Sequence, residues 1–392
     1  MKKILTGSVL LLSVLALAAC GNNSSNGGSN NSSKQVASSN GLEVKVKDGT
    51  YVIPNNASPD SKYLALQVEV KNTGKNEISF YGSNDAKLVD KDEDEIKPKS
   101  DYGTTKSKFK SMDLVTLGKG KSTSGYLVFE VEPDQTYKLE INAKDYSSSK
   151  DTSKSVTLDI DASDYEDNTE GATVLGKKVI DTVYLGKSDE AETESSDSKD
   201  SKDSKDSKDS KDSKDSKDSK DSKDKKSSKS DDYKIATDLE KLKTNFLNEF
   251  KNDLKNDFYQ YKPTDAEVSR MMDQFMAENA KRGKFTYTVK QFYPDYVEIK
   301  AEVEVLDTND FSPYKYSKAK TDAAPIGQYT EVGTAAQKEF VEKFPELISK
   351  LPMASPRYGN DGFEMRFNKN KKGEWVLDTE YSSLSNYAFR MN

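Results

Sequence analysis

A tract of nine uninterrupted Ser-Lys-Asp triplets, residues 198–224, divides the chain into two parts of different character. The tract contains no apolar residue, so it has nothing to bury that would offset the conformational entropy lost on folding. Serine and aspartate are also weak helix formers, and the triplet spacing gives poor pairing along a helix. We therefore predict a disordered linker over residues 188–231, with a separate domain on each side of it.

The first 20 residues predict export from the cell. Lys2 and Lys3 precede a largely apolar run from Ile4 to Ala19, and the run ends at Cys20, the only cysteine of the chain. A basic start, a short apolar segment and small residues before the cleavage position are typical of a secretory signal peptide, here residues 1–19. The run is shorter than the roughly 20 residues that a membrane-spanning helix needs.

The end of this run, Leu17-Ala18-Ala19-Cys20, resembles the lipobox of bacterial lipoproteins. The resemblance implies transfer of a diacylglyceryl group to the Cys20 thiol and cleavage between Ala19 and Cys20. The mature chain would then be anchored on the outer face of the cell membrane, since two acyl chains give stable binding where one does not. The alternatives are an uncleaved membrane anchor and an ordinary signal peptide that leaves Cys20 as a free thiol.

The chain has no histidine among its 392 residues. This excludes Ser-His-Asp and Cys-His nucleophile systems, and it excludes metal sites built on histidine or on several cysteines. We expect no cofactor and no enzymatic activity, although carboxylates, lysines, tyrosines and Ser-Lys pairs remain as catalytic options. The formal net charge is −7 and no basic patch dominates, so we expect no binding to nucleic acid.

Residues 20–41 are mostly Asn, Ser and Gly, and they predict a flexible stalk. Residues 42–187 predict an all-β, immunoglobulin-like sandwich, because short segments of alternating apolar residues are separated by turn-forming sequences. The clearest strand segments are 42–46, 63–70, 124–131, 137–141 and 156–160. Residues 161–187 fit either a last strand pair or a short extension of this domain.

The predicted sandwich also resembles a known family. It carries LQVEVKNTGK at 66–75, AKLVD at 86–90, LGKGK at 117–121 and GYLVFEV at 125–131. In this order the segments resemble the telokin-like, immunoglobulin-type immunoprotective extracellular domain of Gram-positive (Firmicutes) lipoproteins. The resemblance covers about residues 42–160 and implies an extracellular binding or spacer module without a shared catalytic site.

One acidic cluster in this domain has part of the spacing of a calcium-binding loop. Asp90, Asp92, Asp94 and Asp101 match positions one, three, five and twelve of such a loop. The position that requires glycine for the sharp turn is occupied by Glu95. The cluster is therefore a weak calcium candidate, and we predict a charged hairpin tip without a metal.

From residue 232 to residue 392 the apolar period changes and predicts an α+β domain. Apolar residues recur at intervals of three and four from Ile235 to Phe258, which predicts a long amphipathic helix. Thr264 and Glu267 form a capping box that predicts the start of a second helix, and Gly283 predicts its end.

A third helix is predicted around Phe340–Leu351, bent near Pro345, after a loop that carries Pro313 and Pro325. Four strands are predicted at 285–289, 297–305, 363–367 and 374–378. The order of helices and strands favours helices packed on a curved antiparallel sheet.

The closing segment GEWVL at 373–377 resembles the hairpin of nuclear-transport-factor-two-like or cystatin-like domains. Residues 233–392 also resemble a C-terminal domain of unknown function found on Firmicutes lipoproteins. Such sheets often enclose a pocket beneath a long helix, and five aromatic side chains are candidate lining residues: Tyr287, Tyr293, Tyr296, Trp375 and Tyr381. The alternative is that these side chains pack in the core or at its rim.

These features predict a membrane-anchored binding or interaction protein of the cell envelope, with a cell-wall polymer, peptide or protein as its partner. A self-protection protein that sequesters a toxin or bacteriocin would share every one of these sequence features. The third alternative is a carboxylate-dependent hydrolase, which would need two carboxyl groups ~5–9.5 Å apart. Its candidates are Asp295, Glu298 and Asp378.

Overall fold

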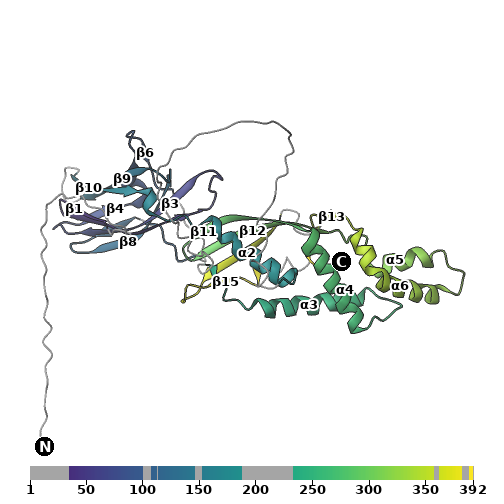
Figure 1. Ribbon diagram of the computed structural model, residues 1–392. Coiled ribbons are helices and arrows are strands. Elements are labelled where there is room, and N and C mark those ends of the chain that lie inside the picture. The colour runs from purple at the N-terminus through teal and green to yellow at the C-terminus, as the bar shows by residue number, and fades with distance from the viewer. Residues whose placement is uncertain are drawn as a thin grey trace, which may run out of the picture. The chain divides into compact units, whose positions relative to one another are not determined.

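The computed structural model describes residues 35–99, 107–112, 114–145, 152–187, 233–356, 362–381 and 388–391. The described residues belong to one compact unit, in which an all-β domain is followed by an α+β domain (Figure 1). This confirms the predicted fold class. The signal peptide with Cys20, most of the predicted stalk and the predicted linker lie outside the described residues.

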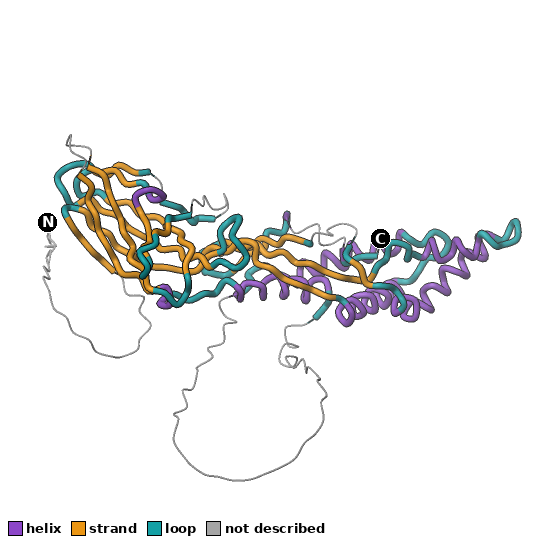
Figure 2. The backbone as a smooth tube through the Cα atoms, turned by 90° about the horizontal axis from the view of Figure 1, so that it is seen from above, coloured by secondary structure: helices purple, strands orange, loops and turns teal. Residues whose placement is uncertain are grey.

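The all-β domain consists of two antiparallel sheets (Figure 2). One sheet has the order β1 (Gln35–Ser39), β2 (Leu42–Val52), β3 (Lys62–Asn72) and β8 (Ser122–Val131). The other contains β6 (Glu95–Ile96), β5 (Ala86–Val89), β9 (Thr136–Asp145), β4 (Ile78–Phe80) and β7 (Val115–Leu117), with β10 (Thr152–Asp161) paired to β9. A single helical turn, α1 (Gly82–Asp85), precedes β5.

The core of this domain lies between the two sheets. Alternate residues of each long strand point inward, as the period-two pattern predicts. The fully buried side chains include Leu64, Leu66, Val68 and Val70 of β3 and Leu139 and Ile141 of β9. The strand segments predicted from the sequence are therefore confirmed.

The predicted stalk ends before residue 41, because residues 35–39 form strand β1. Asn40 and Gly41 both have positive φ, 50° and 84°, which is the geometry of a two-residue hairpin turn. This turn pairs β1 with β2, from Gln35 opposite Val46 to Ser39 opposite Leu42. A Cβ atom at Gly41 would lie 2.7 Å from the Cα atom of Gly74, so the turn also needs glycine for space.

The second domain has an antiparallel sheet of order β11 (Lys284–Tyr293), β12 (Tyr296–Leu306), β14 (Phe363–Lys369) and β15 (Trp375–Leu377). The two-residue strand β13 (Met353–Ala354) pairs with the end of β12. The helices are α3 (Leu239–Asn256), α4 (Asp265–Arg282), α5 (Pro313–Thr321) and α6 (Tyr329–Ser349). All four predicted strands and all three predicted helices are present.

Local sequence signals explain most of these helix boundaries. Thr264 and Glu267 form the predicted capping box at the start of α4. Helix α5 occupies part of what the sequence predicts as a loop. Ser312 caps α5 through the backbone N–H of Lys315, and Pro313 fits its first turn because proline needs no backbone N–H there.

The region before the repeat tract also differs from the prediction. Residues 162–185 form two short 3₁₀ turns, η1 (Ala162–Asp164) and η2 (Glu170–Ala172), then helix α2 (Thr173–Val179) and a π-helical turn, η3 (Ile180–Tyr184). Ala162 of η1 belongs to the core of the sandwich, whereas the buried apolar side chains from Ala172 to Leu185 lie in the core of the second domain. The Tyr184 ring stacks on Phe389 with a centroid distance of 4.6 Å and meets the edge of Phe246 at 5.1 Å.

The domain boundary predicted at residue 187 is therefore misplaced, since the second domain includes α2 and η3 as well as the residues from Tyr233 onward. Tyr233 donates a hydrogen bond through its hydroxyl to the carbonyl oxygen of Asn168. Lys187 is bound through its backbone N–H to the carbonyl oxygen of Asp181, at 2.9 Å. Residues 188–232 thus connect two segments of one domain.

Candidate functional site

The two domains meet where β2 ends and β11 ends. Ile53 and Phe292 exchange two backbone hydrogen bonds of 3.0 Å and form a single antiparallel bridge. Pro54 follows directly and has no backbone N–H, so it cannot extend the ladder. The chain then turns away from β11, and the backbone N–H of Ala57 bonds to the carbonyl oxygen of Pro54.

Aromatic side chains from both domains pack beside this bridge. Phe109 stacks on Tyr126 of β8 at 4.4 Å between centroids and lies 4.8 Å from the ring of Tyr293. Asp295 holds the segment that carries Phe109, because its carboxylate accepts hydrogen bonds from the Ser107 hydroxyl at 2.6 Å and the Lys108 N–H at 2.8 Å. The buried cluster comprises Val52, Tyr63, Ala65, Phe109, Val128, Tyr293 and Tyr296.

A cleft of about 370 Å³ lies next to this junction. Three segments line it: residues 287–290 of β11, the 57–62 region that leads into β3, and residues 167–173 around η2. The end of β2, at Tyr51, Val52 and Ile53, completes the lining. This volume lies within the ~300–1,000 Å³ range that is usual for ligand sites.

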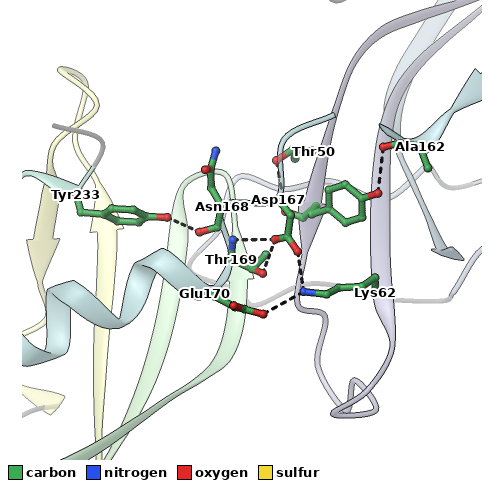
Figure 3. A network of polar contacts seen from close by, with 9 residues as sticks. Thr50, Lys62, Ala162, Asp167, Asn168, Thr169, Glu170 and Tyr233 are labelled. Carbon is green, nitrogen blue, oxygen red and sulfur yellow. Dashed lines mark hydrogen bonds and ion pairs between the residues drawn. The ribbon is translucent and has the colours of Figure 1, made fainter. Parts of the chain in front are cut away.

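Lys62, Asp167, Thr169 and Glu170 form one wall of the cleft. Figure 3 shows the polar contacts among them. The Lys62 ammonium lies 2.7 Å from Asp167 and 3.3 Å from Glu170. Asp167 also accepts hydrogen bonds from the N–H and the hydroxyl of Thr169, at 3.0 and 2.6 Å. The hydrogen bond to Asp167 raises the pKa of Lys62. Burial raises the pKa of Asp167, but the hydrogen bonds from Lys62 and Thr169 outweigh it and the net pKa is lowered.

The remaining polar groups of the cleft are mainly hydroxyls. Burial raises the pKa of Tyr51 to about 12, and its hydroxyl donates to the carbonyl oxygen of Ala162 at 3.1 Å. Burial also raises the pKa of Tyr287. Both phenols are therefore protonated at neutral pH. The charged lining residues Lys62, Lys290, Asp167 and Glu170 balance one another, so the cleft favours a ligand that is polar and uncharged.

The structure separates the five aromatic residues that the sequence suggests as pocket lining. Tyr287 lines the cleft, whereas Tyr293 and Tyr296 are buried in the junction cluster. Trp375 is 1% exposed in the core of the second domain. The guanidinium carbon of Arg366 lies 3.5 Å from the ring centroid of Tyr381, and the two belong to a separate cluster on the sheet. The alternative interpretation, core or rim packing, thus describes four of the five.

Glu298, one of the three candidate catalytic carboxylates, has a structural role in the cluster around Arg366. The Glu298 carboxylate is 8% exposed and accepts hydrogen bonds of 2.8 Å from the Tyr296 hydroxyl and from Nε of Arg366. Tyr381 donates to Glu364, and that bond raises the pKa of Tyr381 to about 12. Pairing across β12 and β14 places Glu298 opposite Arg366, so the ion pair stabilises the sheet.

The other two candidate carboxylates have structural contacts as well. Asp295 binds the Ser107 and Lys108 segment, and Asp378 accepts a long hydrogen bond of 3.4 Å from the Tyr381 N–H. None of the three is among the residues that line the cleft. The arrangement therefore does not bring them together as a catalytic pair within this cavity.

The acidic cluster of the first domain forms the tip of the β5–β6 hairpin. The Asp90 carboxylate accepts hydrogen bonds of 2.9 Å from the backbone N–H groups of Asp92 and Asp94, as in a turn. Asp101 lies outside the described residues. Within the described ranges, no group of three or more His, Cys, Asp or Glu side chains is placed to hold a metal ion.

The sequence did not indicate the residues that form the polar wall of the cleft. Asp167 and Thr169 have the spacing of a local Asx turn, and this is their one readable signal. The contact between Lys62 and Asp167 spans 105 residues of sequence, and no local pattern predicts it.

Comparisons with known proteins agree with this architecture. Residues 32–152 match the model of a domain of unknown function, DUF4352. The crystal structure of ycdA from Bacillus subtilis, described as a “putative lipoprotein”, is similar over 92% of this chain and 100% of that chain, with a TM-score of 0.60 and 16% identity. This likeness supports the two-domain fold along nearly the whole chain.

A Staphylococcus aureus structure with the same description covers 34% of this chain and 98% of that chain, at 17% identity and a TM-score of 0.23. The yjhA structure from Bacillus subtilis covers 32% of this chain and 96% of that chain, at 21% identity and a TM-score of 0.25. No protein with a curated description matches the sequence. In the part of the chain that the structure describes, no helix is both long and apolar enough to span a membrane.

Proposed function

We propose that this chain is a lipid-anchored protein on the outer face of a bacterial cell membrane, where it binds a partner in the cell envelope and catalyses no reaction. The observation that carries the proposal is the sequence Leu17-Ala18-Ala19-Cys20 at the end of a signal-like segment. The likeness to the ycdA structure, described as a “putative lipoprotein”, supports the anchored state. The resemblance of the sandwich to immunoprotective extracellular domains supports the outer-face location.

The contacts of the carboxylates favour binding over hydrolysis. Glu298 is held by Arg366 and Tyr296, and Asp295 is held by Ser107 and Lys108. A hydrolase of the carboxylate type needs one group to act as acid and another as base or nucleophile beside the substrate. The cleft itself contains two carboxylates, Asp167 and Glu170, but both are paired with Lys62. The pKa of Asp167 is lowered, which does not suit a general acid, and most of the other polar groups are hydroxyls that can orient a ligand.

Labelling with radioactive palmitate in a Gram-positive host tests the anchor. We expect the wild-type chain to take up label and to sediment with membranes, and the Cys20→Ala variant to take up none. Ser24→Ala is the matched control and should label normally. Protease added to intact protoplasts should remove the protein, which checks that it lies on the outer face. An unlabelled wild-type chain would contradict the anchor.

Release of wall glycan by the purified chain tests the absence of catalysis. We expect no release above that from a buffer control. Turnover by the wild-type chain that disappears in Glu298→Gln or Asp378→Asn would contradict the proposal and assign the activity to those carboxylates.

A further inference from the structure

The cleft runs along the edge of a strand. Its lining includes four consecutive residues of β11: Tyr287, Thr288, Val289 and Lys290. Successive side chains of a strand point to opposite faces of the sheet. The register of β11 with β12 shifts between Val289 and Gln291, so the alternation applies to Tyr287, Thr288 and Val289. A cavity bordered by these three consecutive residues adjoins the backbone edge of β11, where both faces can be reached.

This edge has no strand partner beside the cleft within the described residues. β11 is the outermost strand of its sheet, and on its outer side only Phe292 is paired, with Ile53. Ile53 forms one rung of a ladder that Pro54 ends. The backbone groups of an unpaired strand edge are a template for another extended chain.

The shape of the opposite wall suits an inserted strand. The chain from Ala57 to Lys62 turns on itself, with the Ser61 N–H bonded to the carbonyl oxygen of Ser58 at 3.2 Å, so it does not approach β11 as a strand. Ile53 borders the cleft and pairs with Phe292, so a segment that enters the cleft lies beside an existing antiparallel bridge.

The charge of the cleft narrows the class of ligand. The charged residues that line the cleft are Lys62, Lys290, Asp167 and Glu170, two positive and two negative, so the lining has no net charge to attract an anion. Tyr287, Val289 and Ile53 supply apolar contact. A peptide backbone presents an uncharged row of N–H and C=O groups at the spacing of β11, which a glycan does not.

We propose that this cleft binds an extended peptide segment, which adds as a strand to the edge of β11 beside Ile53. Main-chain hydrogen bonds supply the affinity in this mode, and the pockets for alternate side chains supply the specificity. The inference deepens the proposed binding function and names the class of its ligand.

The test is selection of a phage-displayed library of random heptapeptides on the full chain, with subtraction on the Thr288→Arg variant. Thr288 is exposed on β11, and arginine there obstructs the edge. Ser58→Arg obstructs the opposite wall and is the second variant. Thr157→Arg is the matched control, because Thr157 is an exposed threonine on β10, a strand of the other domain.

We expect an enriched peptide to bind the wild-type chain and Thr157→Arg equally, and to bind Thr288→Arg and Ser58→Arg at least about tenfold more weakly. The same peptide with alternate backbone amides N-methylated should lose affinity by a similar factor, since its side chains are unchanged. Amide hydrogen exchange at residues 287–290 should slow when the peptide is added. Melting of each variant checks that it is folded.

Three results would overturn the inference. They are the absence of any enriched peptide, an affinity that neither N-methylation nor the cleft variants change, and binding of N-acetylglucosamine tetramer in the cleft without peptide binding. The last result would assign the cleft to a glycan and leave the lipid-anchored binding function intact. Loss of palmitate labelling would instead contradict the anchor and leave the peptide measurement unaffected.

Discussion

The two domains of this protein bury similar apolar side chains but assemble their cores differently. The sandwich core draws on residues between Leu42 and Ala162, a continuous piece of chain. The core of the second domain combines residues 172–185 with residues from Tyr233 to Met391, on opposite sides of the Ser-Lys-Asp tract. The difference shows that a low-complexity tract, which composition alone predicts to be disordered, does not have to mark a domain boundary.

The strongest test of this comparison is to produce two fragments separately. One is the second domain as predicted from the sequence, residues 232–392, and the other also includes α2 and η3. A fragment of residues 232–392 lacks seven buried apolar side chains of this core: Ala172, Leu175, Val179, Ile180, Val183, Tyr184 and Leu185. Burial of one such side chain contributes about 1.5–3 kcal/mol, so the loss is comparable to the whole stability of a domain, ~5–15 kcal/mol.

We therefore expect fragment 232–392 to melt without a cooperative transition, and fragment 166–392 to melt cooperatively, as measured by circular dichroism. A sandwich fragment ending at residue 165 should fold independently. Equal, cooperative melting of the two C-terminal fragments would show that α2 and η3 are dispensable.

Single substitutions in the two cores should act in their own domains. Leu175 of α2 and Leu139 of β9 are both fully buried, and replacement of either by alanine should cost about 2–5 kcal/mol. Amide hydrogen exchange should accelerate in α3 and β12 for Leu175→Ala, and in β9 and β10 for Leu139→Ala. Val174→Ala is the control, because Val174 is exposed on the same helix as Leu175. If Leu175→Ala accelerated hydrogen exchange in the sandwich and not in α3 or β12, α2 would belong to the core of the sandwich instead.

The junction between the domains should be weaker than either core. Asp295→Ala removes the acceptor for the Ser107 hydroxyl and the Lys108 N–H, at a cost of about 1–3 kcal/mol. We expect faster hydrogen exchange at residues 107–112, with β3 and β12 largely unchanged. Asp310→Ala is the control, since Asp310 is almost fully exposed. Unchanged exchange at the junction would show that Asp295 does not hold it.

The Lys62–Asp167 pair should give a small, pH-dependent stabilisation. The pKa of Asp167 is lower in the folded state, so its contribution is present at neutral pH and is lost as pH falls below about 4. Lys62 is partly exposed, and such pairs contribute only about 0–1 kcal/mol. A double-mutant cycle with Lys62→Met and Asp167→Asn should show this coupling at pH 7 and a smaller coupling at pH 3. Equal coupling at both values would exclude the charged pair as its source.

The contrast between the cores also explains why the sandwich was predictable from the sequence and the full extent of the second domain was not. Alternation along β2, β3 and β8 predicts a sandwich because each strand buries one face, and that signal lies within a few residues. The capping box at Thr264 is equally local. Helix α2 gives a weaker signal, because seven residues with Gly176 inside them do not form a clear apolar stripe.

The cleft could not be predicted for a related reason. Its walls come from β2, the 57–62 region, η2 and β11, which are brought together only by the fold. Tyr287 was the one candidate residue that lines it, and the other four aromatic candidates serve packing. The Asn40-Gly41 hairpin is different, since this pair is a recognised turn signal and could have corrected the stalk boundary.

Removal of the nine Ser-Lys-Asp triplets should have the smallest effect. Residues 188–232 connect two segments of the second domain, and a disordered linker, as the sequence predicts, would contribute through its length only a closure entropy of about 0.6 kcal/mol for each halving. We expect the deletion to stabilise the second domain by less than about 1 kcal/mol in urea titrations.

The same deletion distinguishes a loop within one domain from a spacer between two. Spin labels at Thr157→Cys in the sandwich and Ser349→Cys in α6, in a Cys20→Ser background, report the distance between the domains by pulsed electron resonance. If the tract connects two segments of one domain, its deletion should leave that distance unchanged. If the tract were a spacer between the domains, its deletion should shorten the distance. Asp295→Ala should broaden the distance distribution and serves as the positive control. A shortened distance after the deletion would show that the tract separates the two domains. It would contradict the placement of α2 in the core of the second domain.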